Sequence, residues 1–441
     1  MMKTGFLIAA PMSGSGKTTI ARGLMALFVQ KGYCVQPFKC GPDYIDTKFH
    51  AAVCGRPSVN LDTFMATPEH VRHLFDQYGR DADVCVVEGM MGLFDGYDRD
   101  RGSSAEIARV LGLPVVLVVD ARSAAYSMAA LLQGFLRFRD DLRFAGVIFN
   151  KVGSERHARM LREVCADLDV TCLGCLPKCA ELEQGSRYLG LDFSLTPDPS
   201  LGGEGSIYLK AIADKILSSR DICTRKIDEF SAGKSIYSPL LERGAGGEAL
   251  ERGAGGEAFV GEALIAHNSE SFSFLYQETI DRFSRVRFFD PECEVPHFDG
   301  IDLLYLPGGY PEKHAEALVK NSACRQAIRD YAERGGRIVA ECGGMMYLCQ
   351  NIVTDEGAYP MCGVLPYDIT ARKQDRRLSL GYRRFTLDGR EYRGHEFHYT
   401  QFLGDVPPSA AQVYNAKGEP VPTPVLRYKN VLASYTHLYN A

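Results

Sequence analysis

The sequence of 441 residues lacks three features that would each have indicated a different class of protein. It has no apolar run of the roughly 20 residues that a membrane-spanning helix requires. It has no excess of basic residues, since 50 Lys and Arg against 55 Asp and Glu give a net charge of −5. Its 14 cysteines are scattered instead of forming a short disulfide framework. We therefore expect reduced thiols and a cytoplasmic protein with neither a membrane nor a nucleic acid as partner.

The sequence does contain an ordinary apolar fraction, 46%, which is enough to build sizeable cores. Continuous apolar segments alternate with amphipathic ones through the first half of the chain. Strands are predicted over 4–10, 33–38, 84–87, 115–119 and 144–149, and helices over 17–31, 123–138 and 154–168. This alternation predicts an α/β domain with a parallel sheet covered by helices on both faces.

A tandem duplication indicates a domain boundary. The nine residues LERGAGGEA at 241–249 are repeated at 250–258, and a segment so rich in Gly and Glu cannot bury a core. We expect a first domain over 1–232, a flexible linker over 233–258 and a second α/β domain over 259–441. In the second domain, strands are predicted over 259–266, 302–306 and 337–341, a helix over 312–334, and a more β-like tail from about 361.

A Gly-rich segment between the first predicted strand and helix has the setting of a phosphate-binding loop. Its glycines let backbone N–H groups turn toward phosphate oxygens, and the helix directs its positive N-terminus at the same anion. Lys17 can reach the outer phosphates of ATP, and the Thr18 hydroxyl can bind Mg²⁺. The predicted ATP-binding residues are Ser13, Gly14, Ser15, Gly16, Lys17, Thr18, Thr19 and Asn150. Asn150 would contact the base, with a turn-forming role as the alternative.

Acidic residues follow or end several of the predicted strands. Asp43 and Glu88 are predicted to join Thr18 as ligands of Mg²⁺, because the carboxyl ends of parallel strands meet beside such a loop. Asp46 and Asp95 are predicted to belong to the same site, with the capping of a turn as the alternative for each.

The segment RIVAECGGMMYL (337–348) predicts a strand, a sharp turn and a helix, with Cys342 at the turn. This is the pattern of a nucleophile elbow, in which we expect the helix N-terminus to lower the pKa of the thiol. The backbone amides of Gly308, Gly309 and Gly343 are predicted to form an oxyanion hole. A thiol nucleophile needs a base, and the candidates are His437, His395 and His398, each with a structural role as the alternative.

Two further clusters allow a functional and a structural interpretation. Cys172, Cys175 and Cys179 could bind a metal or an iron–sulfur cluster, but a buried strand with Cys as a small apolar residue is favoured. A basic cluster could bind carboxylates, or it could be one solvated face of a hairpin. Its members are Arg372, Lys373, Arg376, Arg377, Arg383, Arg384, Arg390 and Arg393.

Taken together, the motifs resemble those of the cobyrinate a,c-diamide synthase family. They are, in order, SGSGKTT, QPFKCGPDYID, VVEGMMGLFDG, FNKVGSERH, LPGGYPE, AECGGMMYL and SYTHLY. The resemblance implies an N-terminal ATP-binding domain similar to dethiobiotin synthetase and a C-terminal class I glutamine amidotransferase domain. Cys342 matches the nucleophile of that family and His437 its base. Many class I enzymes carry a Glu two residues after this His, but here the position is Tyr439, so the partner that orients His437 is left open.

The resemblance implies an ATP- and glutamine-dependent ligase that amidates the a and c carboxylates of cobyrinate in cobalamin biosynthesis. Lys17 and Thr18 match the family's phosphate loop, and Asp43, Glu88 and Asp95 match its acidic positions. The expected cofactors are ATP and Mg²⁺, and the expected partners are L-glutamine and a polycarboxylate tetrapyrrole, with a homodimer left open. The alternatives are another tetrapyrrole such as nickel-sirohydrochlorin, a ParA/MinD-like switch ATPase, and a hydrolase with an idle phosphate loop.

Overall fold

The computed structural model describes residues 5–178 and 259–439. The chain divides into two compact units, Met1–Gly255 and Gly256–Ala441. The predicted linker at 233–258 lies outside the described residues and stays a prediction. In the described parts of the chain, no helix has the length and apolar character needed to cross a membrane.

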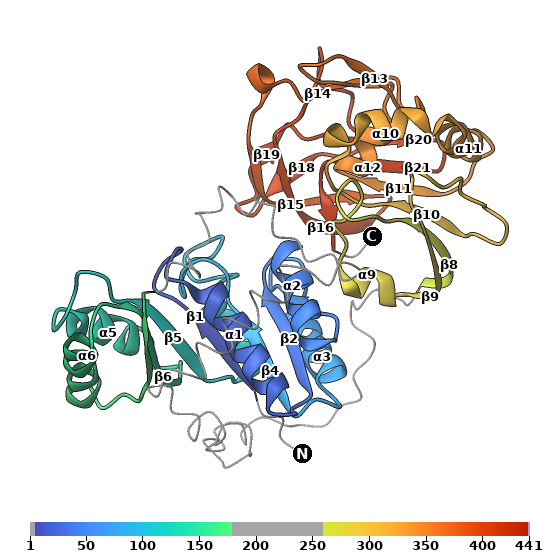
Figure 1. Ribbon diagram of the computed structural model, residues 1–441. Coiled ribbons are helices and arrows are strands. Elements are labelled where there is room, and N and C mark those ends of the chain that lie inside the picture. The colour runs from blue at the N-terminus through green and yellow to red at the C-terminus, as the bar shows by residue number, and fades with distance from the viewer. Residues whose placement is uncertain (1–4, 179–258, 440–441) are drawn as a thin grey trace. The chain divides into compact units, whose positions relative to one another are not determined.

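The first unit is built on one seven-stranded sheet, with its helices packed along it (Figure 1). All of its strand pairs are parallel, in the order β3-β2-β4-β1-β5-β6-β7. The strands are β1 (Gly5–Ala9), β2 (Val35–Cys40), β3 (Val59–Leu61), β4 (Val84–Glu88), β5 (Val115–Asp120), β6 (Phe144–Val152) and β7 (Cys172–Pro177). The helices are α1 (Lys17–Gln30), α2 (Ile45–Cys54), α3 (Pro68–Tyr78), α4 (Ser104–Leu111), α5 (Met128–Arg137) and α6 (Glu155–Asp167).

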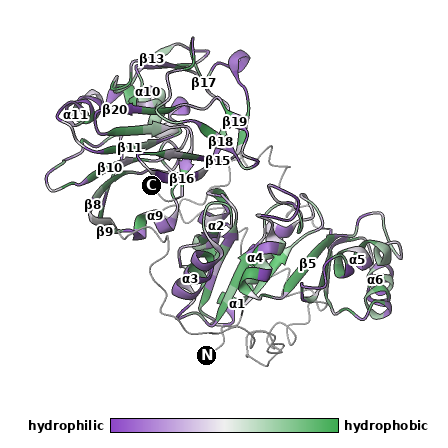
Figure 2. Cartoon of the chain, turned by 180° about the vertical axis from the view of Figure 1, so that it is seen from behind, coloured by the Kyte–Doolittle hydropathy of each residue, from purple (hydrophilic) through white to green (hydrophobic). Residues whose placement is uncertain are grey.

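Both faces of this sheet are covered, which confirms the predicted fold class. Phe6 and Ile8 of β1 pack in one core with Leu24 of α1. Leu7 points to the opposite face, because side chains alternate along a strand, and it is also fully buried. A strand such as β1 is therefore apolar throughout, and Figure 2 shows β5 mainly in the colour of hydrophobic residues.

Local signals explain where the helices begin. Ser103 and Ser154 cap α4 and α6, each accepting a hydrogen bond from the backbone N–H three residues ahead. The helix predicted over 123–138 begins only at Met128, because Ser123 has φ of 56°, outside the right-handed helical region. Helices α2, α3 and α4 and the short strand β3 were not predicted from the sequence.

The second unit has a six-stranded sheet in the order β20-β21-β11-β10-β8-β9. Every pair is parallel except β20 with β21. Its strands are β8 (Phe259–Ala266), β9 (Phe283–Phe289), β10 (Leu303–Leu306), β11 (Ile338–Glu341), β20 (Val425–Tyr428) and β21 (Val431–Ser434), with the short helices α9 (Gln277–Asp281) and α12 (Gly343–Leu348).

Two smaller sheets account for the β-like tail that the sequence predicted. The first joins β13 (Ala358–Pro360), β12 (Asn351–Val353), β14 (Asp368–Thr370) and β17 (Gln401–Phe402). The second joins β19 (Pro420–Val421), β18 (Val413–Asn415), β15 (Ser379–Leu387), β16 (Arg390–His398) and β22 (His437–Leu438). A 3₁₀ turn, η4 (Lys373–Asp375), precedes the β15–β16 hairpin.

The single helix predicted over 312–334 is wrong. The segment forms a 3₁₀ turn, η3 (Pro311–Lys313), followed by α10 (Ala315–Lys320) and α11 (Ser322–Glu333). The breaks fall at His314 and at Asn321, whose side chain caps α11 by accepting a hydrogen bond from the backbone N–H of Cys324. The predicted end at residue 334 is close to the observed end at Glu333, and Gly335 follows with φ of 85°.

Candidate functional site

The predicted phosphate loop lies at the carboxyl end of β1 and leads directly into α1. Gly14 and Gly16 have φ of 80° and 90°, which favours glycine at both positions. Asn150, near the end of β6, which lies beyond β5 in the sheet, donates a hydrogen bond from Nδ2 to the carbonyl of Ser15 over 3.0 Å. A Cβ on Gly16 would overlap this amide. Asn150 therefore supports the loop from β6, and its contact with a nucleotide base stays a prediction.

The side chains of Lys17 and Thr18 reach from α1 toward the end of β4. Lys17 donates a hydrogen bond from Nζ to the carbonyl of Met91 over 2.7 Å, and Thr18 donates from its hydroxyl to Glu88 over 2.6 Å. Burial, with the nearby charge of Lys39, lowers the pKa of Lys17 to about 8. An anion placed against Lys17 would therefore favour its charged form.

Three of the four predicted acidic residues, Asp43, Asp46 and Glu88, gather around the ammonium of Lys39. Its Nζ lies 3.6 Å from Glu88, 3.4 Å from Asp46 and 4.0 Å from Asp43. Burial opposes ionisation of Glu88, but Lys39 and a 2.7 Å contact with His50 outweigh it and hold the pKa of Glu88 at about 2.

Lys39 was not predicted from the sequence, because the predicted strand ended at residue 38. In the structure, Lys39 belongs to a strand that is buried from end to end, so its charge requires partners. Arg22, which is 1% exposed and lies 2.8 Å from Asp46, was not predicted either. The fourth predicted residue, Asp95, does not join this cluster in the described contacts, since its carboxylate accepts a hydrogen bond from the backbone of Gly92. That contact matches the turn-capping alternative.

Cys342 forms a sharp turn between β11 and α12. Its backbone has φ of 46° and ψ of −108°, and its N–H donates to the carbonyl of Ser434 over 2.8 Å. A strained non-glycine residue between strand and helix is the geometry that the sequence predicted. The prediction of a lowered pKa is wrong, however. Burial and the nearby charge of Glu312 raise the pKa of the Cys342 thiol and outweigh the hydrogen bond from the Gly343 backbone. The thiol is therefore protonated at rest and needs a base.

The three predicted oxyanion-hole glycines lie together beside this turn. A Cβ on Gly343 would come within 3.0 Å of the Gly309 backbone nitrogen and 2.8 Å of Pro311 Cδ. A Cβ on Gly308 would overlap Cε1 of His437. The structure thus brings Gly308, Gly309 and Gly343 together with His437. Gly343 directly follows Cys342 in the sequence.

His437 lies on β22, opposite His395 of β16, and its side chain is 1% exposed. The two imidazole rings stack with centroids 5.0 Å apart. Burial and the neighbouring His395 lower the pKa of His437 well below its usual range. Of the other two candidates, His395 places its Nδ1 3.0 Å from the hydroxyl oxygen of Tyr276. His398 stacks on Tyr435 with ring centroids 3.7 Å apart. Among these three, it is His437 that lies against the Gly308 backbone.

The close contact of Gly308 with His437 gives a testable expectation. Gly308→Ala should lower glutamine hydrolysis by about 10²-fold, because a displacement of a catalytic group by ~1 Å has an effect of that size. The matched control is Gly357→Ala, since a Cβ at Gly357 meets no atom within 4 Å. Steady-state release of glutamate measures both. Equal rates for the two variants would contradict the placement of His437 in the reaction.

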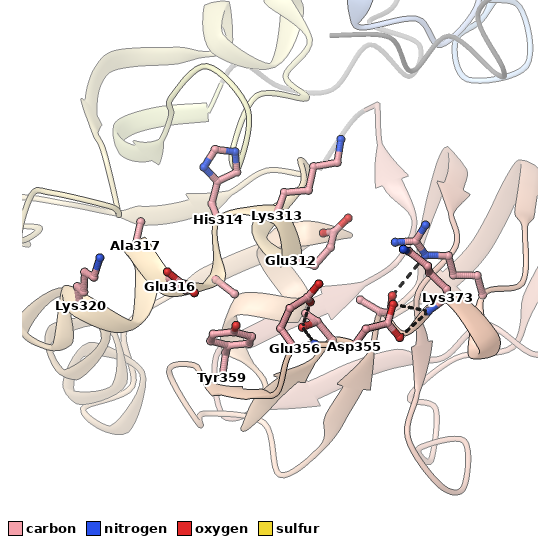
Figure 3. A pocket seen from close by; sticks show the side chains of 14 residues that line it. Glu312, Lys313, His314, Glu316, Ala317, Lys320, Asp355, Glu356, Tyr359 and Lys373 are labelled. Atoms are coloured by element: carbon pink, nitrogen blue, oxygen red, sulfur yellow. Dashed lines mark hydrogen bonds between the residues drawn. The ribbon is translucent and has the colours of Figure 1, made fainter. Parts of the chain in front are cut away.

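A charged cavity of about 580 Å³ lies next to η3 (Figure 3). Its wall includes Glu312, Lys313, His314, Ala315, Glu316, Ala317, Lys320, Thr354, Asp355, Glu356, Tyr359, Ala371, Lys373 and Arg376. Figure 3 shows acidic and basic side chains interspersed around the cavity, with Asp355 beside Lys373. Such a cavity suits a small molecule that carries both charges.

The predicted basic cluster does not form a single patch. Lys373 and Arg376 line the cavity, whereas Arg383 is buried and its Nε lies 2.9 Å from Glu396. Arg384 and Arg393 face each other across the β15–β16 hairpin. The hairpin interpretation therefore applies to part of the cluster.

The predicted cysteine cluster is only partly described. Cys172 and Cys175 lie on β7 with their sulfur atoms 4.0 Å apart, and Cys179 lies outside the described residues. Within residues 5–178 and 259–439, no group of three or more His, Cys, Asp or Glu side chains is spaced to hold a metal ion by itself. The observed strand fits the interpretation of Cys172 and Cys175 as small apolar residues.

Comparison with known proteins adds two family matches that cover most of the chain. Residues 6–189 match the CobQ/CobB/MinD/ParA nucleotide binding domain, and residues 267–441 match the CobB/CobQ-like glutamine amidotransferase domain. These matches coincide with the phosphate loop in the first unit and with the cysteine turn in the second.

Full-length relatives are also known. The chain is 37% identical over 450 residues to hydrogenobyrinate a,c-diamide synthase of Rhizobium meliloti (strain 1021), with 98% of each chain covered. It is 38% identical over 454 residues to the enzyme of the same name from Brucella abortus biovar 1, again with 98% of each covered. It is 36% identical over 449 residues to cobyrinate a,c-diamide synthase of Caldanaerobacter subterraneus subsp. tengcongensis, covering 98% of this chain and 94% of that protein.

Proposed function

Since the chain belongs to the family of hydrogenobyrinate and cobyrinate a,c-diamide synthases, we propose that it uses ATP and L-glutamine to amidate the a and c carboxylates of a corrinoid. It is a glutamine-hydrolysing, amide-forming ligase of cobalamin biosynthesis. The observation that carries the residue-level proposal is the buried arrangement of Cys342, His437 and the Gly308 backbone. A switch ATPase would leave that arrangement without a use.

In the glutaminase reaction, the Cys342 sulfur attacks the side-chain amide carbon of glutamine. His437 accepts the thiol proton and returns it to the departing nitrogen, so that ammonia leaves and a thioester remains. Backbone N–H groups of Gly308, Gly309 and Gly343 would stabilise the oxyanion of the tetrahedral intermediate. Water then hydrolyses the thioester to glutamate. Ammonia formed in this way is unprotonated and can act as a nucleophile.

In the synthetase reaction, a substrate carboxylate attacks the γ-phosphorus of ATP and releases ADP. The resulting acyl phosphate has a good leaving group, so ammonia attacks its carbonyl carbon and phosphate departs. Lys17, with the loop amides, would bind the phosphates and stabilise the charge that develops between them. Lys39, within 4.0 Å of three carboxylates, holds those side chains in place.

The oxygen donors of Thr18, Asp43 and Glu88 fit Mg²⁺ that arrives with ATP. The described side chains do not form a metal cage by themselves. Mg²⁺ in nucleotide sites uses only one or two carboxylates, and phosphates and water complete its shell. Bound there, the ion would neutralise phosphate charge during transfer.

The cavity beside η3 is proposed as the site where glutamine enters. Pro311 of η3 lies against Gly343, the residue after the nucleophile. The charge of Glu312 acts on the Cys342 thiol, and the charge of Arg376 acts in turn on Glu312. Glu312 would bind the α-ammonium of free glutamine, and Arg376 its α-carboxylate.

Arg376→Ala is therefore expected to raise the KM for glutamine by about 10- to 100-fold, because a hydrogen bond to a charged group contributes ~1.5–3 kcal/mol. Amidation driven by added ammonium chloride should not change. Lys320→Ala is the matched control, since Lys320 lines the same cavity but is not among the charges that act on Glu312. An unchanged KM for glutamine in Arg376→Ala would contradict the proposal that glutamine binds in this cavity.

The proposed function as a whole is tested by product mass. The protein is incubated with ATP, Mg²⁺ and glutamine together with cobyrinate, hydrogenobyrinate or nickel-sirohydrochlorin in separate reactions. A diamide from either corrinoid, dependent on both ATP and glutamine, supports the proposal. A diamide formed only from nickel-sirohydrochlorin would reassign the substrate, and product formed without ATP would exclude a ligase.

A further inference from the structure

The base His437 lacks the orienting group that its position in the sequence would suggest. Two residues after His437 stands Tyr439, whose side chain is fully buried and packs on Tyr276 with ring centroids 5.0 Å apart. It carries no carboxylate. A histidine that accepts a proton from a thiol needs a group that fixes its tautomer and offsets its positive charge. Another residue must therefore take this role.

A carboxyl group from a different strand lies beside the ring of His437. Glu341 is the last residue of β11 and directly precedes Cys342. Its Oε2 lies 4.0 Å from Nδ1 of His437, and the two side chains are 2% and 1% exposed. Because β11 pairs in parallel with β21, Glu341 is opposite Ser434, three residues before His437. The sheet register thus brings Glu341 beside the segment that leads to His437.

The surroundings of Glu341 show a carboxyl held in a defined position. The side chain of Tyr305 and the backbone of Leu438 form hydrogen bonds with it. Its other oxygen, Oε1, has no hydrogen-bond partner among the described residues. Burial raises the pKa of Glu341 to about 8. A buried carboxyl with an unsatisfied oxygen destabilises the fold, which is the kind of cost that functional groups carry.

The contacts of the imidazole distinguish its two nitrogen atoms. A Cβ on Gly308 would overlap Cε1 of His437, the His395 ring stacks on the imidazole, and Nδ1 is the nitrogen that lies 4.0 Å from Glu341. Nε2 is therefore the nitrogen that the proposed reaction leaves for the thiol.

We propose that Glu341 is the positioning residue of His437 and takes the place of the missing Glu after the histidine. It accepts a hydrogen bond from Nδ1–H and offsets the positive charge that the ring gains when Nε2 takes the thiol proton. The separation of 4.0 Å is longer than a hydrogen bond, but such contacts commonly tighten only when substrate is bound. The inference rests on the proposed glutaminase reaction and names a residue that acts through its base.

The test compares three variants of the full-length enzyme at pH 8.5, chosen because burial raises the pKa of Glu341 to about 8. Glu341→Gln keeps the volume and an oxygen for the bonds from Tyr305 and Leu438, but it cannot become negative. We expect kcat for glutamine hydrolysis to fall by about 10²-fold or more, with the KM for glutamine within about threefold. Glu341→Asp should recover part of kcat, because it retains the charge.

Tyr305→Phe is the matched control. It removes the bond from the Tyr305 side chain to the same carboxyl and leaves the carboxyl itself, so kcat should stay within about fivefold of the parent value. Amidation driven by ammonium chloride reports whether each variant is folded, because it bypasses glutamine. We expect it to be unchanged in all three.

Three results would overturn the inference. The first is a kcat in Glu341→Gln within threefold of the parent value. The second is an equal loss in Glu341→Gln and Tyr305→Phe, which would indicate a structural role. The third applies if Glu341→Gln also loses ammonia-driven amidation and is therefore misfolded. In that case, a folded Glu341→Asp variant that recovers no kcat for glutamine hydrolysis would overturn the inference. Failure of the proposed function is recognised separately, since the parent enzyme would then release no glutamate.

Discussion

Cys342→Ala is expected to reduce glutamine-dependent amidation by about 10³-fold or more, the scale seen when a catalytic nucleophile is removed. The thioester cannot form without the sulfur, and water attacking the amide directly is a far slower reaction. Alanine keeps the Cβ, so the strained turn at φ of 46° should persist. Amidation driven by ammonium chloride should remain within about threefold of the parent rate. Product mass measures amidation with either nitrogen source, and glutamate release measures glutamine hydrolysis.

Cys349→Ala provides the control for this experiment. Cys349 is also fully buried and lies at the end of the same helix, where its thiol contacts the carbonyl of Met345. Its replacement removes a sulfur atom from the same core without touching the turn. If Cys342→Ala retained glutamine-dependent product formation, the nucleophile would have to be sought elsewhere.

The second large effect is expected from the phosphate loop. Lys17→Ala should lower amidation by about 10²- to 10³-fold with either glutamine or ammonia as nitrogen source, the usual effect of removing one group that stabilises transition-state charge. Both nitrogen sources depend on the acyl phosphate, so both should fail together. Glutamate release by the second unit should continue. The paired assay therefore separates the two chemical steps within one variant.

Lys31→Ala is the control for Lys17→Ala. Lys31 lies at the other end of α1, about 20 Å away at 1.5 Å per residue. The two variants share the helix and the lost charge but not the loop. Undiminished amidation in Lys17→Ala would mean that Lys17 takes no part in activating the carboxylate.

The fold could be predicted wherever one strong pattern was decisive. Strand β1 and the first five residues of β5 are apolar because both of their faces are covered, and both strands were predicted at nearly their observed bounds. The segment from 311 to 334 could not be predicted, because its breaks depend on the backbone at His314 and on the cap at Asn321. Helix periodicity continues across such short breaks.

The site was predictable only where a motif contained the functional residue. Cys342, His437 and the glycines belong to short motifs, and the structure brings them together. Lys39 and Glu341 belong to the same motifs, but nothing in the order of residues indicates which neighbours they meet. The pKa of Cys342 was misjudged for a related reason, because burial is a property of the packed unit and outweighs the helix terminus.

The position of Lys39 also bears on the order in which ligands arrive. Its ammonium, together with Arg22, already serves as counter-ion to the carboxylates of Asp43, Asp46 and Glu88. A bare divalent ion would have to compete with these two cationic side chains for the same carboxylates. A metal that enters already bound to a triphosphate brings its own anionic ligands, so the synthetase half is suited to load metal and nucleotide in a single event.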